Sequence, residues 1–162
     1  MSQPPIRSTH FDAAGHAQMV DVSAKPVTIR TATAAGCVRM QAETAAMIRG
    51  GTAAKGDVLA IARLAAITAT KLTPLLIPLC HAIAVEGVEV HFRFDNETTL
   101  CCEVDVRTSG KTGVEMEAMT AVTAACLTVY DMCKSVDRGM TIGQVRLLHK
   151  TGGASGTYRA ES

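Results

Sequence analysis

The chain has 162 residues, of which 48% are hydrophobic and 19% are charged, and its formal net charge is +1. This length and composition are typical of one globular domain, and the near-neutral charge argues against non-specific nucleic-acid binding. Aromatic residues make up only 3%, which argues against a stacking platform for single strands. We therefore expect no nucleic-acid partner, and a small molecule or another protein instead.

The N-terminal stretch lacks the apolar core of a signal peptide, and no uninterrupted apolar run is long enough to span a membrane. We expect a cytoplasmic protein without membrane contact. Its predicted parts are a flexible lead-in at residues 1–18, one catalytic domain at residues 19–158 and a flexible tail at residues 159–162.

The first half of the domain predicts a strand and two helices. Residues 27–40 carry β-branched side chains at intervals, which predicts a strand, and residues 41–49 form a short helix ended by two glycines. Asp57 is a good N-cap for a second helix, which Pro74 is expected to end. The predicted apolar surface of this helix consists of Ile61, Leu64, Ala65, Ile67 and Ala69.

A β-hairpin comes next. Residues 85–95 and 98–108 alternate apolar and polar side chains, and Asp95-Asn96-Glu97 forms the turn between them. The alternation predicts one face in the core and one in water. The core-facing side chains would be Val88, Val90, Phe92, Phe94, Leu100, Cys102, Val104 and Val106.

Thr112 and Glu115 have capping-box spacing at the start of a long helix that runs to about Lys134, and residues 141–150 predict a last strand. The resulting order predicts an α+β fold, a ferredoxin-like plait with one additional helix and with helices on one face of an antiparallel sheet. The uncovered sheet face favours oligomerisation.

No two of the six cysteines have the C-x-x-C spacing of a zinc or redox site, so we expect no metal. Cys101, Cys102, Cys126 and Cys133 are interpreted as small buried hydrophobic residues in a reducing compartment.

The stretch "SGKTG" at residues 109–113 ends like a phosphate-binding loop, but Asp105 stands where that motif requires glycine. We interpret the stretch as a strand-to-helix turn in which Gly110 and Gly113 allow unusual backbone angles and Thr112 caps the helix.

Two carboxylates follow this turn. Glu115 and Glu117 suit the first turn of a helix because its dipole favours negative charge there. They point to different sides, so one can satisfy the cap while the other faces a cleft.

Two further residues have a structural and a functional interpretation. Lys55 lies two residues before Asp57, where a cation and a helix N-terminus can bind one anion together, although a solvated loop lysine is the alternative. His81 ends an apolar run, either as a half-buried structural side chain or as a proton carrier.

The segment "TVYDMCKSVD" places Asp131 and Lys134 three residues apart on one helix. They can form an ordinary surface ion pair, but their apolar neighbours Tyr130, Met132 and Cys133 predict partial desolvation and hence an acid–base pair.

A second cation precedes a glycine-rich tail. Lys150 is followed by Gly152, Gly153 and Gly156, which predicts a flexible segment that closes a cation over a bound anion.

Six stretches together carry a family resemblance: "MVDVSAK", "KGDVLAIAR", "LIPLCH", "KTGVEMEAMTA", "YDMCK" and "VRLLHKTGG". From Met19 to about Tyr158 the chain resembles the molybdenum cofactor biosynthesis protein C family, the cyclic pyranopterin monophosphate synthases. The resemblance implies a lyase that converts a cyclised dihydroguanosine triphosphate, made from GTP by an upstream radical enzyme, into cyclic pyranopterin monophosphate and pyrophosphate. It also implies a homohexamer, a trimer of dimers with active sites at subunit interfaces.

By motif match, the resemblance implies that Asp131 and Lys134 are the catalytic pair, with Lys55 and His81 as further catalytic residues. It implies a substrate pocket that also contains Arg30, Cys80, His81, Glu115, Met116, Glu117 and Lys150. We expect no required cofactor, with Mg2+ a possible companion of the triphosphate.

The alternative function is a noncatalytic ferredoxin-like oligomer that binds a small anionic effector. Its fold would be the same, and its site would need the cations. A desolvated acid and base in one pocket would instead favour an enzyme.

Overall fold

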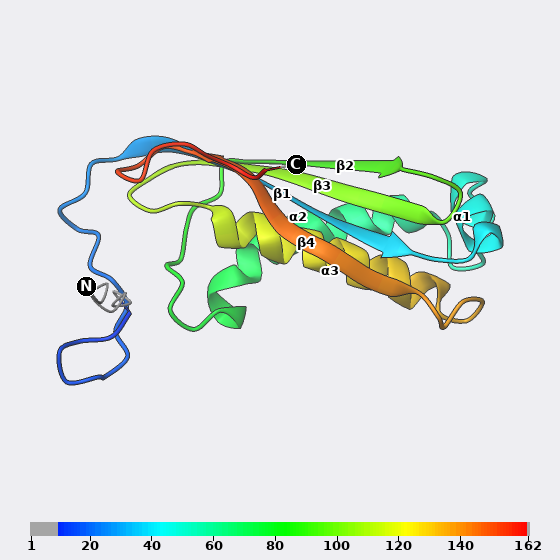
Figure 1. The fold of residues 1–162 in the computed structure, drawn as a ribbon, viewed down its shortest axis with the longest axis horizontal. Coiled ribbons are helices and arrows are strands. Elements are labelled where there is room, and N and C mark those ends of the chain that lie inside the picture. Colours follow the sequence, from blue (N-terminus) through cyan, green and yellow to red (C-terminus); the bar gives the residue numbers. More distant parts are fainter. Residues whose placement is uncertain (1–9, 162) are drawn as a thin grey trace, which may run out of the picture.

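The computed structural model describes residues 10–161 and shows an antiparallel sheet in the order β2-β3-β1-β4-β5 (Figure 1). The first nine residues of the expected lead-in and Ser162 of the expected tail lie outside this range. The strands are β1 (Thr28–Arg39), β2 (Gly87–Phe94), β3 (Thr99–Gly110), β4 (Thr141–Thr151) and β5 (Tyr158–Arg159).

The helices are α1 (Ala42–Arg49), α2 (Val58–Leu76) and α3 (Glu115–Cys133). Helices α2 and α3 form a second layer along one face of the sheet, and α1 lies at one end of the molecule (Figure 1). The predicted α+β ferredoxin-like plait with an additional helix is confirmed. The short β5, which follows the glycine-rich loop, is added at the edge of β4.

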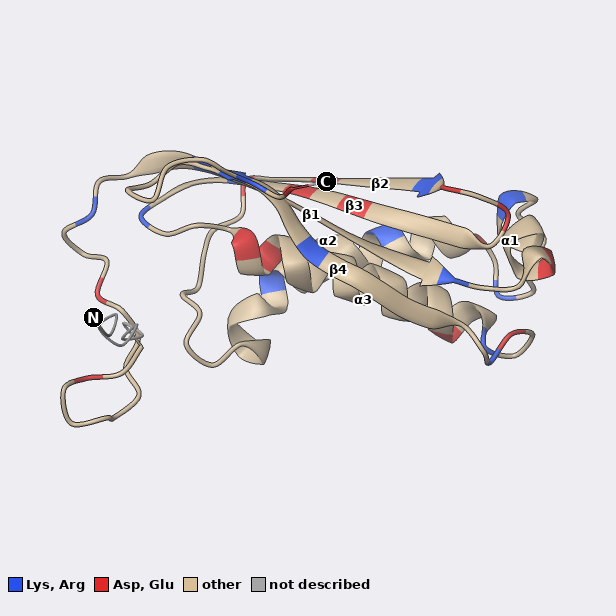
Figure 2. Ribbon diagram, in the orientation of Figure 1, with Lys and Arg blue, Asp and Glu red and all other residues tan. Residues whose placement is uncertain are grey.

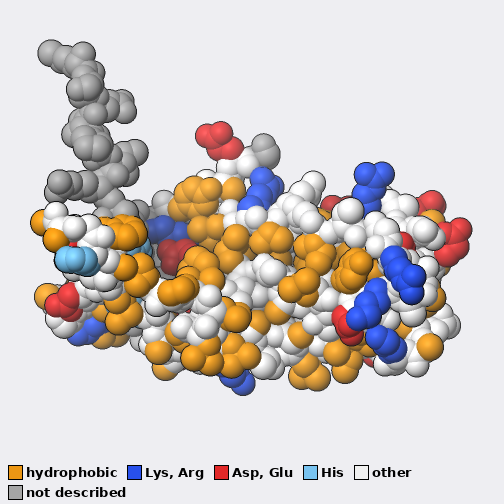
Figure 3. Space-filling view, turned by 90° about the horizontal axis from the view of Figure 1, so that it is seen from below, with side chains coloured by type: hydrophobic (Ala, Val, Ile, Leu, Met, Phe, Trp, Pro, Cys, Tyr) orange, Lys and Arg blue, Asp and Glu red, His pale blue; other side chains and the backbone are white. Residues whose placement is uncertain are grey.

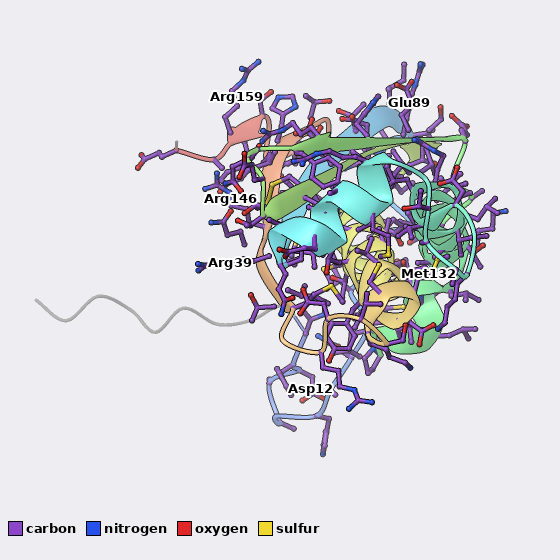
Figure 4. The ribbon with its side chains drawn as sticks, turned by 90° about the vertical axis from the view of Figure 1, so that its right-hand side faces the viewer. Asp12, Arg39, Glu89, Met132, Arg146 and Arg159 are labelled. Atoms are coloured by element: carbon purple, nitrogen blue, oxygen red, sulfur yellow. A yellow bond between two sulfur atoms is a disulfide. The ribbon has the colours of Figure 1, made fainter. Side chains whose placement is uncertain are left out.

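The hairpin has the predicted alternation. Val90, Leu100 and Val104 are buried against the helices, and β2 and β3 pair from Gly87 with Arg107 to Phe94 with Leu100. Seen end-on, Glu89 and Arg146 point away from the helices, whereas Met132 lies on the helix side (Figure 4). The sheet therefore has one apolar face and one polar face.

The predicted inward face of α2 is only partly right. Ala62, Ala66 and Thr73 pack inward, whereas Ile61 and Leu64 are exposed, Leu64 by 60%. Small side chains let two helices and a sheet approach closely, and such a contact has no space for larger ones. Apolar side chains consequently lie on the surface seen in Figure 3.

Two predicted helix signals are wrong and one is confirmed. Asp57 caps α2 by accepting a hydrogen bond from the Ala60 N–H at 3.0 Å. Helix α2 does not end at Pro74 but continues to Leu76, because a proline in the last turn removes only one intrahelical bond. Thr112 does not cap α3, because Val114 is the N-cap residue and its apolar side chain makes no capping hydrogen bond.

Helix α2 is also the one helix among residues 10–161 that is long and apolar enough to cross a membrane by length and composition alone. It carries Arg63, whose guanidinium donates to the Val90 carbonyl and lies 5.5 Å from the centre of the Phe92 ring. We therefore assign α2 to the helix layer of the domain.

The interpretation of the four cysteines as buried free thiols is right for three of them. Cys102, Cys126 and Cys133 are buried and free, and burial raises the pKa of Cys102 to about 12 and that of Cys126 to about 11. Cys101, however, forms a disulfide with Cys37. The β1/β3 register places these two residues directly opposite each other, although they are 64 positions apart in the chain.

Candidate active site

The predicted site residues fall into two groups at opposite ends of α3. Charged residues mark both ends of this helix (Figure 2). The α3 C-terminal triad consists of Lys55, Asp131 and Lys134. The α3 N-terminal cluster consists of Arg30, Cys80, His81, Glu115, Met116, Glu117 and Lys150.

The triad forms where the loop before α2 meets the C-terminal end of α3. Lys134 donates to Asp131 Oδ1 at 2.6 Å, and Lys55, from the loop before α2, donates to the Asp131 carbonyl at 3.0 Å. The Lys55 ammonium also lies 3.6 Å from Asp131 Oδ2. The structure therefore brings these three predicted site residues into contact.

The predicted desolvation of the pair is wrong. The side chains of Asp131 and Lys134 are 59% and 52% exposed, because the last turn of α3 buries Met132 and Cys133 on its other side. The hydrogen bond from Lys134, and then its charge, lower the pKa of Asp131, and the same contact raises the pKa of Lys134. In one chain both groups therefore keep their charges.

The acidic residues of the N-terminal cluster lie in different surroundings. Glu117 is 1% exposed, and burial raises the pKa of its carboxyl. Its Oε1 lies 3.9 Å from Cys80 Sγ, and its Oε2 has no hydrogen-bond partner among the described residues. Such a buried oxygen is costly unless a ligand or water satisfies it.

Glu115 is half-buried and folds back over Gly113. A Cβ atom at residue 113 would lie 1.9 Å from Glu115 Oε2. The predicted unusual backbone angles at Gly110 and Gly113 are not found, since neither has a positive φ. A side chain at residue 113 would instead displace the Glu115 carboxylate. Neither Glu115 nor Glu117 replaces the missing side-chain cap at Val114.

A cavity of about 390 Å3 joins part of this cluster. Its walls include Cys80, His81, Glu115 and Met116, and the N-terminal segment closes one side through Val20. The His81 ring Nε2 lies 2.8 Å from the Val20 carbonyl oxygen. Burial, followed by the charge of Glu117, raises the pKa of the Cys80 thiol.

The cations of the cluster lie on the sheet side. Lys150 pairs with the buried Ala32 across β1 and β4, so its side chain points toward the helices, as does that of Arg30 two residues before Ala32. Both are buried. Arg30 Nε donates to the Gly110 carbonyl at 2.8 Å, and the Lys150 ammonium contacts Ser155 Oγ.

The glycine-rich loop packs directly on Arg30. A Cβ atom at Gly153 would lie 2.1 Å from Arg30 Nη1, and Gly152, Gly153 and Gly156 all have positive φ. A second cavity, of about 660 Å3, is lined by Glu115 and Lys150. Glu115 therefore borders both cavities.

Three contacts of the site were not foreseen. Val20 lies in the "MVDVSAK" stretch, which contributed to the resemblance but had no assigned role. Ser155 binds Lys150 from within the glycine-rich loop. Asp137 is buried and accepts from the Gln41 N–H at 2.8 Å, which anchors the segment after Lys134 to the start of α1. The Val20 and Asp137 contacts join parts of the chain that are far apart in sequence, whereas Ser155 lies only five residues after Lys150.

Neither group of site residues contains a set of side chains spaced to bind a metal. Within residues 10–161, the one set of three potential metal ligands close together is Cys37, Asp95 and Cys101, on the β1 and β3 strands and the hairpin turn. The chemistry offered by the two groups is instead that of buried cations, a buried carboxyl and an exposed acid–base pair.

Comparison with known proteins shows the family of the chain. Residues 19–153 match the model of the MoaC family. The chain is 54% identical to the cyclic pyranopterin monophosphate synthase of Desulfitobacterium hafniense, with 94% of each chain covered. It is 51% identical to the enzyme of that name from Rhodopirellula baltica, over 99% of this chain and 97% of the relative. It is 55% identical to the one from Parvibaculum lavamentivorans, over 94% and 96%. The chain therefore belongs to the MoaC family.

Proposed function

We propose that the protein is a cyclic pyranopterin monophosphate synthase, a lyase of molybdenum cofactor biosynthesis. The observation that carries this function is the identity of 51–55%, over nearly the full chain, to three relatives of that name. The substrate is a cyclised dihydroguanosine triphosphate, supplied by an upstream radical enzyme, and the products are cyclic pyranopterin monophosphate and pyrophosphate.

Arg30 and Lys150 bind the phosphates. Both are buried cations on the same face of adjacent strands, and a guanidinium or ammonium without an anion is costly in such a place. Charge-assisted hydrogen bonds from them would stabilise the negative charge that develops on the leaving pyrophosphate.

Glu117 binds the ring end of the substrate. Its Oε2 has no hydrogen-bond partner within residues 10–161, and a purine-derived ring presents N–H groups that can donate to it. Cys80, His81 and Met116 line the adjoining cavity, where His81 can move a proton. This assignment gives a role to Glu117 Oε2, whose burial without a hydrogen bond would otherwise reduce the stability of the fold.

The triad supplies acid–base catalysis. Asp131 is ionised and Lys134 is protonated, and Lys55 lies beside them, so the triad can exchange protons at the C–N bonds that are rearranged once substrate or a second chain excludes water. The exposed pair in the single chain is consistent with a site that another chain completes.

The active site is composed of two chains in a homohexamer, a trimer of dimers. Asp131 lies 16 residues after Glu115 in α3, which corresponds to about 24 Å along the helix axis. One small substrate does not reach both groups in one chain. Exposed apolar side chains on the helix layer, including Leu64, Leu72 and Leu127, offer surface for a neighbouring chain.

The reaction requires no redox cofactor, because its proposed steps are proton transfers and phosphate cyclisation. Mg2+ accompanies the triphosphate if any metal is needed, and we place the protein in the cytoplasm with its upstream enzyme.

The deciding experiment incubates the pure protein with the cyclised triphosphate and measures pyrophosphate and the pterin product. Absence of both products, with and without Mg2+, would favour the noncatalytic effector-binding alternative.

Lys150 and its glycine-rich loop form a clamp on the triphosphate. Lys150→Ala should weaken substrate binding and turnover together, whereas Lys150→Arg should retain part of both. Substrate should also slow protease cleavage near Gly152. Equal cleavage with and without substrate would contradict the clamp.

A further inference from the structure

The Cys37–Cys101 disulfide lies on the polar face of the sheet. Gly36 and Val38, on either side of Cys37, face the core, and so do Leu100 and Cys102 on either side of Cys101. Side chains alternate along strands, so both sulfur atoms point away from the helices. The pair is thus on the face opposite to Arg30 and Lys150.

Asp95 aims a carboxylate at this pair. Its Oδ2 lies 3.1 Å from Cys101 Sγ, while Arg93 contacts its Oδ1. The Asp95 N–H donates to the Thr99 carbonyl at 3.0 Å, which fixes the hairpin turn. One oxygen is therefore held by a cation and the other is directed at sulfur, which is how supporting contacts orient ligands in metal sites.

Ligand atoms from Cys37, Asp95 and Cys101 all lie within 4.8 Å of one another. A cavity of about 350 Å3 borders all three residues. Cys37 is half-buried, Asp95 is partly exposed and Cys101 is buried. An ion can consequently reach the sulfur atoms from the cavity, which also has room for water.

We propose that, when the disulfide is reduced, Cys37, Cys101 and Asp95 form a binding site for a thiophilic divalent cation of the Zn2+ class. Two thiolates and a carboxylate are ligands that Zn2+ accepts, and three protein ligands leave the fourth position to water from the cavity. The three negative charges are balanced by the divalent ion and Arg93. Once the disulfide is reduced, rotation of the Cys37 and Cys101 side chains lets the two sulfur atoms move apart to the distance between two ligands of one ion.

The site is controlled by thiol–disulfide exchange. Two molecules of a small thiol reduce the disulfide to two cysteine thiols and are themselves joined in a small-molecule disulfide. Metal binding then releases two protons from the thiols. Oxidation by a small-molecule disulfide reverses the sequence and expels the ion, since the bonded sulfur atoms are no longer thiolates.

The test uses the full-length protein, reduced with dithiothreitol and desalted under nitrogen, and titrates it with Co2+ and then Zn2+. One ion per chain should bind, with the sulfur-to-cobalt charge-transfer absorption of two thiolate ligands. Cys37→Ser should weaken binding by about 100-fold, and Asp95→Asn by about 10-fold with thiolate absorption retained. Two control variants should bind the ion as wild type does. They are Cys102→Ala, on the helix-facing side of β3, and Cys80→Ser, in the cavity that His81 also lines.

Two results would overturn the proposal: no thiolate–cobalt absorption in the reduced wild type, or equal binding by Cys37→Ser. Should Cys37→Ser not fold, Zn2+ must still slow alkylation of Cys37 and Cys101 in the wild type, as mapped by mass spectrometry. Protein with an intact disulfide must bind no ion at this site. These measurements do not depend on turnover, so they stand apart from the proposed enzyme function.

Discussion

Glu115 begins helix α3 and Asp131 lies in its last turn, so one rigid element separates these two residues by about 24 Å along its axis. Each carboxylate belongs to a different group of site residues. The first predictions follow from this separation.

Loss of the triad should abolish turnover without unfolding the protein. Because Asp131 and Lys134 are more than half exposed, Asp131→Asn and Lys134→Ala should leave the melting temperature close to that of the wild type. Turnover should fall by about 100-fold or more, the usual effect of losing a general acid or base. Lys71→Ala, at an exposed lysine of α2, is the matched control. Near-normal turnover by either triad variant would remove that residue from the mechanism.

Mixed oligomers should restore activity if the site is shared between chains. We expect a refolded mixture of Lys134→Ala and His81→Ala to regain activity, because about a quarter of two-chain sites would combine two intact halves. The control mixes Lys134→Ala with Asp131→Asn, whose lesions lie in the same triad, and should remain inactive. Pyrophosphate release measures both, and mass spectrometry confirms mixing. An inactive first mixture would indicate that each site belongs to one chain.

The glycine-rich loop offers a paired test of Arg30. Gly153→Ala and Gly156→Ala place alanine at similar positive φ angles, +76° and +65°, at a backbone cost of about 1 kcal/mol each. Only the Cβ at residue 153 collides with the Arg30 guanidinium. Gly153→Ala should therefore raise KM for the triphosphate by about 10-fold more than Gly156→Ala does. Equal effects would show that loop strain, not the position of Arg30, is responsible.

Buried Glu117 should give stability a recognisable pH dependence. Its folded-state pKa is raised above the ordinary value of 4.5, mainly by burial, so the folded protein binds this proton more tightly than the unfolded chain. Its contribution to stability is then greatest at low pH and is lost as the pH rises through the folded-state pKa.

Glu117→Gln keeps the shape of the side chain and removes this titration. The melting temperature of Glu117→Gln relative to wild type should increase as the pH rises above the ordinary carboxyl value of 4.5. Glu43→Gln, at an exposed glutamate in the first turn of α1, serves as the control. A constant difference between Glu117→Gln and wild type across this range would contradict the raised pKa.

Local patterns in the sequence were sufficient for most of the fold. The alternation in the hairpin depends only on which side chains can face a core, and Asp57 acts through a bond to Ala60 three residues away. The pairing of Asp131 with Lys134 is likewise a property of helix periodicity. Such interactions involve near neighbours, so the chain itself specifies them.

The predictions from sequence that were wrong concern which side chains are buried where helices pack against their neighbours. The outward direction of Leu64 depends on how closely α2 approaches its neighbours, and the exposure of Asp131 depends on which side of α3 meets the sheet. Burial is a property of the packed layers, and a linear pattern does not contain it.

The sequence by itself determined the order of the main strands and helices and the family resemblance. Tertiary structure alone decided that Lys55 joins Asp131, that Arg30 and Lys150 are buried together, and that Cys37 meets Cys101. The physical reason is strand register: a pairing across 64 residues is set by the hydrogen bonds of β1 with β3, and no spacing motif within the chain encodes it.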